Sequence, residues 1–267
     1  MGLVDAGGIE FDCERSGSGP PLLMIMGMSG TALSWGERFL DELRRDFEVI
    51  VYDPRGVGAS TRLEGPITTA EMAGDAHALI GALGLDSAHV LGISMGGMVA
   101  QELALAHPEA IRTLTLGCTY CGGPDGVRMD PRELEPLIAA RRSGDREAAI
   151  RASWEFNVSP SFAGEEAEWR AFAERAVRRP VAISVIARQA QAIEAHDTCA
   201  RLGSIALPTL VIHGTLDRLL PVENGRMVAG LIPGARLEIL EGVGHMFFLE
   251  RPERSAALVR EHAAVHA

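Results

Sequence analysis

Short apolar runs alternate with longer stretches of mixed polarity along this chain. The apolar runs are rich in Val, Ile and Leu, which is typical of strands that are buried on both faces of a parallel sheet. We expect seven such strands, at residues 8–15, 21–27, 47–53, 88–94, 113–119, 209–214 and 236–242. Helical stretches separate or follow them, at residues 34–45, 69–83, 95–107, 222–231 and 252–262. The pattern predicts an α/β fold with a mostly parallel sheet flanked by helices.

The alternation stops between residues 122 and 205, where no strand-like run occurs and helical periodicity continues. Glycine and proline signals divide this part into four helical candidates, at residues 130–145, 146–157, 164–179 and 181–196. We therefore expect residues 122–205 to form a helical cap. The cap would be inserted into an α/β core made of residues 1–121 and 206–267.

Charge and composition narrow the function. The chain has 267 residues and a net charge of -11, and it contains no dense basic run, so nucleic acid and anionic membrane surfaces are poor partners. No apolar run is long enough to cross a bilayer, and the first residues do not have the pattern of an export signal. We expect a cytoplasmic protein that binds a small-molecule substrate. The sequence leaves the oligomeric state open, including a homodimer.

Four cysteines, Cys13, Cys118, Cys121 and Cys199, are scattered along the chain. Their spacing predicts buried reduced thiols more than a disulfide framework. Cys118 and Cys121 form a C-T-Y-C sequence, but no second pair and no thioredoxin-like unit accompany it, which argues against redox chemistry. The histidines show no metal-ligand spacing. We expect neither a metal ion nor a cofactor.

One serine stands where a predicted strand runs directly into a predicted helix. Gly92, Ser94 and Gly96 form a G-x-S-x-G pattern, and its strand–turn–helix context is that of an exposed nucleophile. A serine hydroxyl is a weak nucleophile, so it needs a base and a group that orients the base. The alternative for Ser94 is a structural role as a helix cap.

Two later loops offer the missing groups. Asp217 follows the strand at residues 209–214, and His245 lies in a glycine-containing loop after the strand at residues 236–242. Loops at the carboxyl ends of parallel strands meet at one edge of a sheet, so the three side chains are expected to converge there. We assign Ser94 as nucleophile, His245 as base and Asp217 as acid. A helix-capping role remains the alternative for Asp217.

The oxyanion that forms during acyl transfer needs hydrogen-bond donors. The N–H of Met95 lies at the start of the helix after Ser94, and the N–H of Met28 follows Gly27 in the loop after the second strand. We expect these two groups to form the oxyanion hole. Several methionines and cap aromatic residues predict a soft, apolar pocket, to which we assign Gly27, Trp154 and Met246.

With these residues the chain resembles the α/β-hydrolase family over essentially its whole length. The stretch Y-D-P-R-G-V-G-A-S, which contains Asp53 and Arg55, resembles the turn that follows a strand in this family. Many members carry His-Gly at the oxyanion strand, whereas this chain has Met26 and Gly27, as do relatives that resemble methyl esterases of aromatic polyketide pathways. The resemblance extends to esterases and enol-lactonases and implies a serine nucleophile under a helical cap.

The expected activity is hydrolysis of a carboxylic ester or lactone of a small, largely apolar substrate through an acyl-enzyme on Ser94. Three alternatives stay open. The same residues serve hydrolysis of a carbon–carbon bond in a ring-fission diketone. Acyl transfer to an alcohol or amine differs only in the acceptor. A ligand receptor that keeps the fold is the third alternative.

Overall fold

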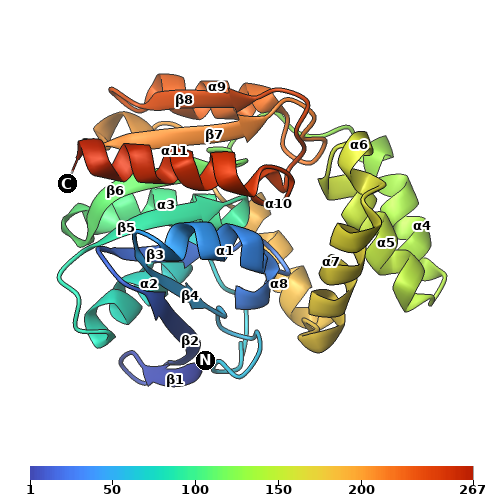
Figure 1. Cartoon of the computed structure of the whole chain (residues 1–267), viewed down its shortest axis with the longest axis horizontal. Coiled ribbons are helices and arrows are strands. Elements are labelled where there is room, and N and C mark those ends of the chain that lie inside the picture. The colour runs from blue at the N-terminus through green and yellow to red at the C-terminus, as the bar shows by residue number, and fades with distance from the viewer. Residues whose placement is uncertain (267) are drawn as a thin grey trace.

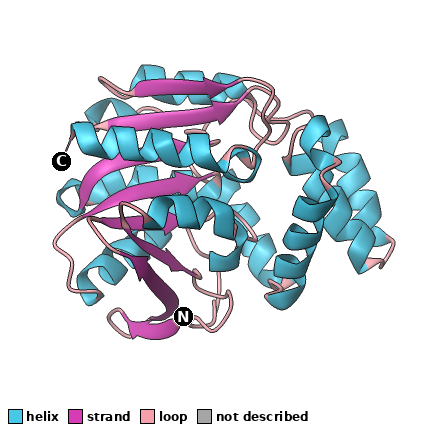
Figure 2. Ribbon diagram, in the orientation of Figure 1, coloured by secondary structure: helices cyan, strands magenta, loops and turns pink. Residues whose placement is uncertain are grey.

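The computed structural model describes residues 1–266 and contains one eight-stranded sheet (Figure 1, Figure 2). The strand order is β1-β2-β4-β3-β5-β6-β7-β8, and only the pairs β1–β2 and β2–β4 are antiparallel. This arrangement confirms the predicted α/β fold with a mostly parallel sheet. The strands are β1 (Gly2–Asp5), β2 (Glu10–Gly17), β3 (Pro21–Ile25), β4 (Glu48–Tyr52), β5 (Ala88–Ile93), β6 (Ile111–Gly117), β7 (Thr209–Gly214) and β8 (Arg236–Leu240).

Helices cover both faces of the sheet. On one face α1 packs on α11, and on the other α2 packs on α3, with α9 against β7. Leu22 and Met24 of β3 contribute to the core on the α1 side, whereas Leu23 and Ile25 contribute to the core on the α2 side. Burial on both faces explains why the strands are continuous apolar runs. The core helices are α1 (Glu37–Arg44), α2 (Thr69–Ala82), α3 (Met95–Ala106), α9 (Val222–Leu231), α10 (Phe247–Glu250) and α11 (Pro252–Val265).

Two local details differ from the predicted elements. Strand β1 was not expected, because Gly2–Asp5 is a short, mostly exposed edge strand without an apolar run. The single helix expected at residues 34–45 is split into the short 3₁₀ helix η1 (Ala32–Trp35) and α1. Gly36 separates them with a φ of 75°, a conformation that a side chain disfavours and that ends the first helix.

Between β6 and β7 the regular elements are helices, and α4 to α7 stand beyond the carboxyl ends of the parallel strands, while α8 returns towards the sheet (Figure 1). We call residues 122–205 the cap segment. The short helix α6 within it was not expected. The helices of the cap segment are η3 (Pro131–Leu134), α4 (Glu135–Arg142), α5 (Arg146–Asn157), α6 (Pro160–Ala163), α7 (Glu166–Arg178) and α8 (Ile183–Glu194), followed by the 3₁₀ turn η4 (Leu202–Ser204).

The two ends of the cap segment lie side by side. Gly122 and Asp197 form an isolated antiparallel bridge, and the N–H of Thr198 donates to the Cys121 carbonyl at 2.8 Å. A disulfide joins Cys121 to Cys199, while Cys13 and Cys118 are free and buried. The expectation of four reduced thiols was therefore wrong for this pair. The residues are 78 positions apart, and only the return of the chain from the cap segment brings them together.

No helix among residues 1–266 has the length and apolar character that a membrane crossing requires.

Candidate active site

Ser94 occupies a strained turn between β5 and α3. Its φ is 56° and its ψ is −124°, a sparsely populated combination for a residue with a side chain. The Ser94 side chain makes no capping hydrogen bond to α3, so its hydroxyl does not serve as a helix cap. Its N–H donates to the Gly117 carbonyl of β6 at 2.9 Å. The turn therefore holds the serine by its backbone and leaves its hydroxyl uncommitted to the helix.

Glycines make this turn sterically feasible. A Cβ on Gly96 would lie 2.0 Å from the Ile25 carbonyl oxygen, and one on Gly92 would lie 2.3 Å from the Gly96 carbonyl oxygen. Both distances are far below van der Waals contact. The glycines of the G-x-S-x-G pattern are thus required by the close approach of α3 to β3 and β5.

Asp217 and His245 form a buried hydrogen-bonded pair. His245 Nδ1 lies 2.7 Å from Asp217 Oδ2, and the two residues are 5% and 6% exposed. The other oxygen of Asp217 accepts hydrogen bonds from the N–H groups of Leu219 and Leu220, both at 2.9 Å. Because an ionised carboxylate accepts from Nδ1–H, Nε2 of His245 is left as the basic nitrogen.

Opposing effects act on the pKa of Asp217. Burial alone would raise it, but the nearby His245 and hydrogen bonds from His213 and His245 hold the pKa well below its usual value. The carboxyl group therefore stays ionised at neutral pH. An ionised acid in this position stabilises a protonated His245.

A second histidine, His213, also contacts the acid. Its Nε2 lies 2.7 Å from the Leu220 carbonyl oxygen and 3.3 Å from Asp217 Oδ2. Since a carbonyl oxygen only accepts, Nε2 carries the proton, and His213 ties the loop of Asp217 to the end of β7. His213 was not among the site residues predicted from the sequence. The sequence signal for this contact was the spacing of four residues between His213 and Asp217. That spacing does not specify the conformation of the loop between them.

The neighbouring strand ends bring Ser94 towards this pair. Thr119 Oγ1 donates to the Ser94 carbonyl at 2.7 Å. The adjacent Cys118 offers a sulfur within 4.8 Å of ligand atoms of both Asp217 and His245. The hydrogen bonds of residues 1–266 include none between Ser94 Oγ and His245.

The loop that contains Gly27 and Met28, which is the expected oxyanion loop, lies against the serine. A Cβ on Gly27 would lie 2.9 Å from Ser94 Cβ and 3.4 Å from Ser94 Oγ, so only glycine fits there without displacement. Met28 follows Gly27, and Met95 is the first residue of α3. The N–H groups in the first turn of a helix have no intrahelical partner, which leaves the Met95 N–H available. Of the two expected donors, Met95 directly follows the serine in the chain, and Met28 follows a glycine that packs against the serine.

The other two expected pocket residues lie in different surroundings. Trp154 of α5 is 0% exposed, packs on Phe162 and Phe172, and donates from Nε1 to the Ala163 carbonyl at 3.1 Å. These contacts are all within the cap segment. Met246 is partly exposed, and its N–H donates to the Asn157 carbonyl at 2.9 Å. A contact of either residue with substrate stays a prediction.

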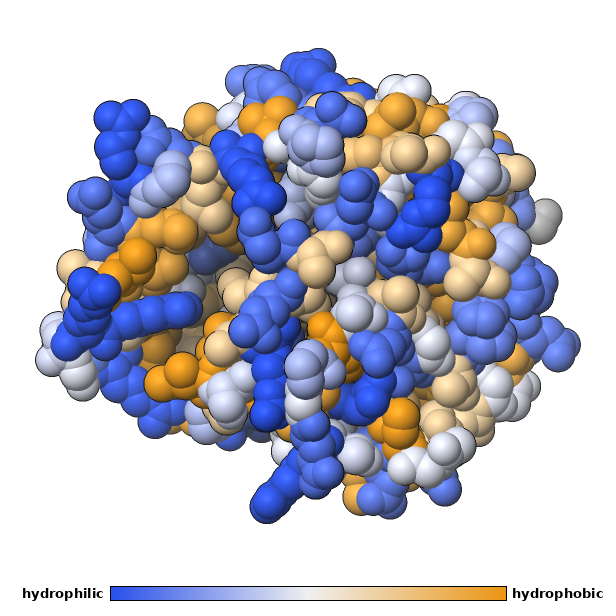
Figure 3. Space-filling model, turned by 180° about the vertical axis from the view of Figure 1, so that it is seen from behind, coloured by the Kyte–Doolittle hydropathy of each residue, from blue (hydrophilic) through white to orange (hydrophobic). Residues whose placement is uncertain are grey.

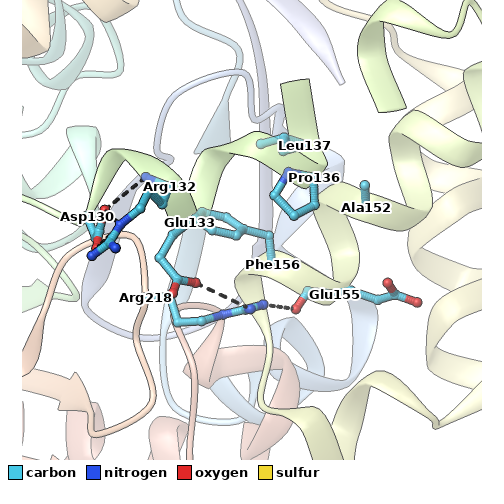
Figure 4. A pocket seen from close by; sticks show the side chains of 9 residues that line it. All are labelled: Asp130, Arg132, Glu133, Pro136, Leu137, Ala152, Glu155, Phe156 and Arg218. Carbon is cyan, nitrogen blue, oxygen red and sulfur yellow. Dashed lines mark hydrogen bonds and ion pairs between the residues drawn. The ribbon is translucent and has the colours of Figure 1, made fainter. Parts of the chain in front are cut away.

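The cap segment is fastened to the loops of the site. Arg218, the residue after Asp217, donates to the Glu155 carbonyl and places its guanidinium 5.1 Å from the centre of the Phe156 ring. It also lies 3.7 Å from Glu133 and lines a pocket of about 620 Å³ between α4 and α5 (Figure 4). Arg218 spans that pocket beneath Phe156, so the loop that contains Asp217 is held to α5.

Arg179, at the end of α7, pairs with two carboxylates of the core. It lies 3.0 Å from Asp12 of β2 and makes a close ion pair with Asp53 after β4. The Asp53 carboxylate also accepts from the Ala32 N–H at 2.7 Å, at the start of η1. Asp53 therefore connects the start of η1 to the cap segment. Seen from behind, the surface is hollowed between the cap segment and the core, and apolar side chains border the hollow (Figure 3).

Among residues 1–266, two groups of side chains could each present three metal-ligand atoms, but their chemistry is unfavourable. The first group contains Cys118, Asp217 and His245. Burial raises the pKa of the Cys118 thiol well above its usual value, which disfavours the thiolate that a metal needs. The second group contains His77, His107 and Glu109. The rings of His77 and His107 are stacked 3.8 Å apart and nearly parallel, so their in-plane lone pairs do not converge on one ion.

Comparison with known proteins places these features in a family. A profile of the α/β hydrolase fold matches residues 20–252. A protein of Azorhizobium caulinodans named "Putative carbamate hydrolase RutD" is 31% identical over 257 residues, which cover 95% of this chain and 94% of that protein.

Solved structures agree with the profile. An esterase of Exiguobacterium antarcticum superimposes with a TM-score of 0.86 at 26% identity, covering 99% of this chain and 100% of the other. The enol-lactonase of Burkholderia xenovorans LB400 gives a TM-score of 0.84 at 25% identity, with 98% and 100% covered. The chain therefore belongs to the α/β hydrolase fold family and is a hydrolase of that fold.

Proposed function

We propose that the protein is a serine hydrolase that cleaves a carboxylic ester or lactone of a small, largely apolar substrate through an acyl-enzyme on Ser94. The observation that carries this proposal is the pairing of His245 with an ionised, buried Asp217 at the sheet edge where Ser94 stands in its strained turn. Such a pair supplies a base held in one tautomer, which a serine nucleophile requires. The esterase and the enol-lactonase among the similar structures support this substrate class.

The mechanism follows from the roles of these groups. His245 Nε2 takes the proton of Ser94 Oγ as that oxygen attacks the substrate carbonyl carbon. The negative charge moves to the carbonyl oxygen, which the N–H groups of Met28 and Met95 stabilise. The carbon–oxygen bond to the leaving alcohol then breaks, and the alkoxide receives the proton from His245. Water, deprotonated by the same nitrogen, attacks the acyl-enzyme, and the acid and free Ser94 are released.

Active-site labelling tests the proposal. Incubation with a fluorophosphonate and mass analysis of peptides should show stoichiometric labelling at Ser94, because only an activated serine reacts readily. Ser94→Ala should remove the label and lower ester turnover by about a thousandfold or more. Ser143→Ala, a change at an exposed serine of the cap segment, is the matched control and should alter neither result. A folded wild-type protein that takes up no label would refute the proposal.

Carbamate hydrolysis is a second candidate, because the relative from Azorhizobium caulinodans is named for that activity. The same nucleophile would attack the carbamate carbon, and the substrate's nitrogen would change only the leaving group or the acyl-enzyme. Turnover of an ester and a carbamate with matched substituents separates the two activities. Carbamate turnover that exceeds ester turnover would favour this second function.

A further inference from the structure

Gln189 is a fully buried amide on the cap segment. It lies on the buried face of α8, together with Val185 and Ala192, and is 0% exposed. A side-chain amide has an oxygen that accepts hydrogen bonds and a nitrogen that donates two, and buried polar groups nearly always use these capacities. The partners of Gln189 therefore indicate what the residue does.

The oxygen of Gln189 has a partner in the oxyanion loop. Oε1 accepts from the N–H of Ser29 at 2.9 Å, and Ser29 has a φ of 59°. Because a backbone N–H can only donate, this contact fixes the orientation of the amide, with Oε1 towards Ser29 and Nε2 on the other side. Gln189 thus joins α8 to the loop of Met28.

The nitrogen of Gln189 is buried and has no hydrogen-bond partner in the part of the chain that the structure describes. An unpaired buried donor costs free energy, and native proteins rarely keep one without a use. An acceptor oxygen of a bound substrate would give Gln189 Nε2 the hydrogen-bond partner that it lacks.

The position of the amide indicates which part of a substrate it faces. Ser29 is two residues after Gly27, where a Cβ would lie 2.9 Å from Ser94 Cβ, and Met28 between them carries a proposed oxyanion donor. The leaving alcohol takes its proton from His245, so it lies on the side of the His245 loop. Gln189 contacts the loop of Met28 instead, which places it beside the acyl part of the substrate.

We propose that Gln189 Nε2 donates a hydrogen bond to an oxygen in the acyl part of the substrate, close to the scissile carbonyl. The inference rests on the proposed serine hydrolase function and specifies its substrate class. The preferred substrates are esters or lactones whose acyl part carries an ether, keto or hydroxyl oxygen in addition to the reacting carbonyl. Gln189 is then a specificity-determining residue supplied by the cap segment.

Two esters of equal length test this proposal. In 4-nitrophenyl methoxyacetate an ether oxygen replaces one methylene group of 4-nitrophenyl butyrate, and the leaving group is the same. We define the preference ratio as kcat/KM for the methoxyacetate divided by kcat/KM for the butyrate, with active enzyme counted by fluorophosphonate titration. The intrinsic reactivity difference of the esters cancels when the ratios of two variants are compared.

Gln189→Glu keeps an oxygen for the Ser29 N–H and removes the donor, so the preference ratio should fall about tenfold. Gln189→Met removes both functions without adding charge and should lower the ratio similarly. Gln191→Glu makes the same chemical change at an exposed position of the same helix and should leave the ratio at the wild-type value.

Equal ratios in the wild type, Gln189→Glu and Gln189→Met would overturn the inference. The proposed function would still stand in that case, because Ser94 is labelled and both esters are hydrolysed. A wild-type protein that neither takes up the label nor hydrolyses either ester would overturn the inference together with the proposed function.

Discussion

Glu250 and Ser159 are joined by two hydrogen bonds between α10 and the cap segment. The N–H of Ser159 donates to Oε1 at 2.9 Å and its hydroxyl donates to Oε2 at 2.5 Å. Oε1 also accepts from the N–H of Gly244 at 2.8 Å, directly before His245. Glu250 is 4% exposed and Ser159 is 1% exposed. One buried carboxylate thus holds the loop of the proposed base against the junction of α5 and α6.

Glu250→Ala should reduce both stability and turnover. The change leaves three buried donors unpaired and is expected to lower the free energy of unfolding by about 3 kcal/mol. Because the loop of His245 loses its support, kcat should fall more than KM rises. Glu250→Gln keeps an oxygen for the two N–H groups and should recover most of kcat, while Ser159→Ala removes only the hydroxyl bond. Urea unfolding and ester kinetics measure these effects. Equal kcat in Glu250→Ala and wild type would contradict the positioning role.

Arg179→Met should destabilise the protein more at neutral pH than in mild acid. Burial raises the pKa of Asp53, while the Ala32 N–H and Arg179 oppose that rise. A raised folded-state pKa means that stability falls as pH increases through that pKa, because the folded state binds the proton more tightly. Without Arg179 this loss of stability is larger. We therefore expect Arg179→Met to lower the free energy of unfolding by about 3 kcal/mol at pH ~7 and by less at pH ~5.

Urea unfolding at the two pH values measures this difference. Arg178→Met, a change at the exposed neighbouring residue, is the control and should have little effect at either pH. A loss for Arg179→Met that is equal at both pH values would show that the ion pairs are not its cause.

Stability should also fall on acidification below the usual pKa of histidine. Burial lowers the pKa of His89 and of His196 from 6.5 to about 4. Between these values the unfolded chain binds protons that the folded chain does not, so stability declines as pH falls through the window and levels off below it. Each histidine contributes up to about 3 kcal/mol to this decline.

Urea unfolding at pH ~7 and pH ~4.5 gives the size of this decline. His196→Asn should reduce it by up to about half, because the change removes one of the two histidines whose pKa is lowered to about 4. His266→Asn, at an exposed histidine, should leave it unchanged. The same decline in His196→Asn and wild type would exclude His196 as a source.

Thiol counting tests the disulfide. Protein prepared without reductant and then denatured should react with iodoacetamide at two cysteines, Cys13 and Cys118, and at all four after reduction. Cys199→Ser should raise the unreduced count to three, because Cys121 loses its partner, whereas Cys13→Ser should lower it to one. Four reactive thiols in the unreduced wild type would mean that Cys121 and Cys199 are not joined.

Local patterns determined much of what could be predicted. The seven predicted strands all occur, with ends within two residues of those observed, because strands buried on both faces need continuous apolar runs. Ser94, Asp217 and His245 could be selected because each follows a strand in a turn or loop with its own sequence signature, and the structure pairs the last two. The edge strand β1 was missed because it has no such run.

The contacts between the cap segment and the core were decided only by the tertiary structure. The sequence predicts that α8 has an apolar face. It does not show that Gln189 on this face contacts Ser29, a residue 160 positions away. The same holds for Arg179 with Asp53 and for Cys121 with Cys199. The physical reason is that hydrophobic periodicity specifies which face of a helix is buried, whereas the packing of several such faces selects the polar partners among many residues of the same kind.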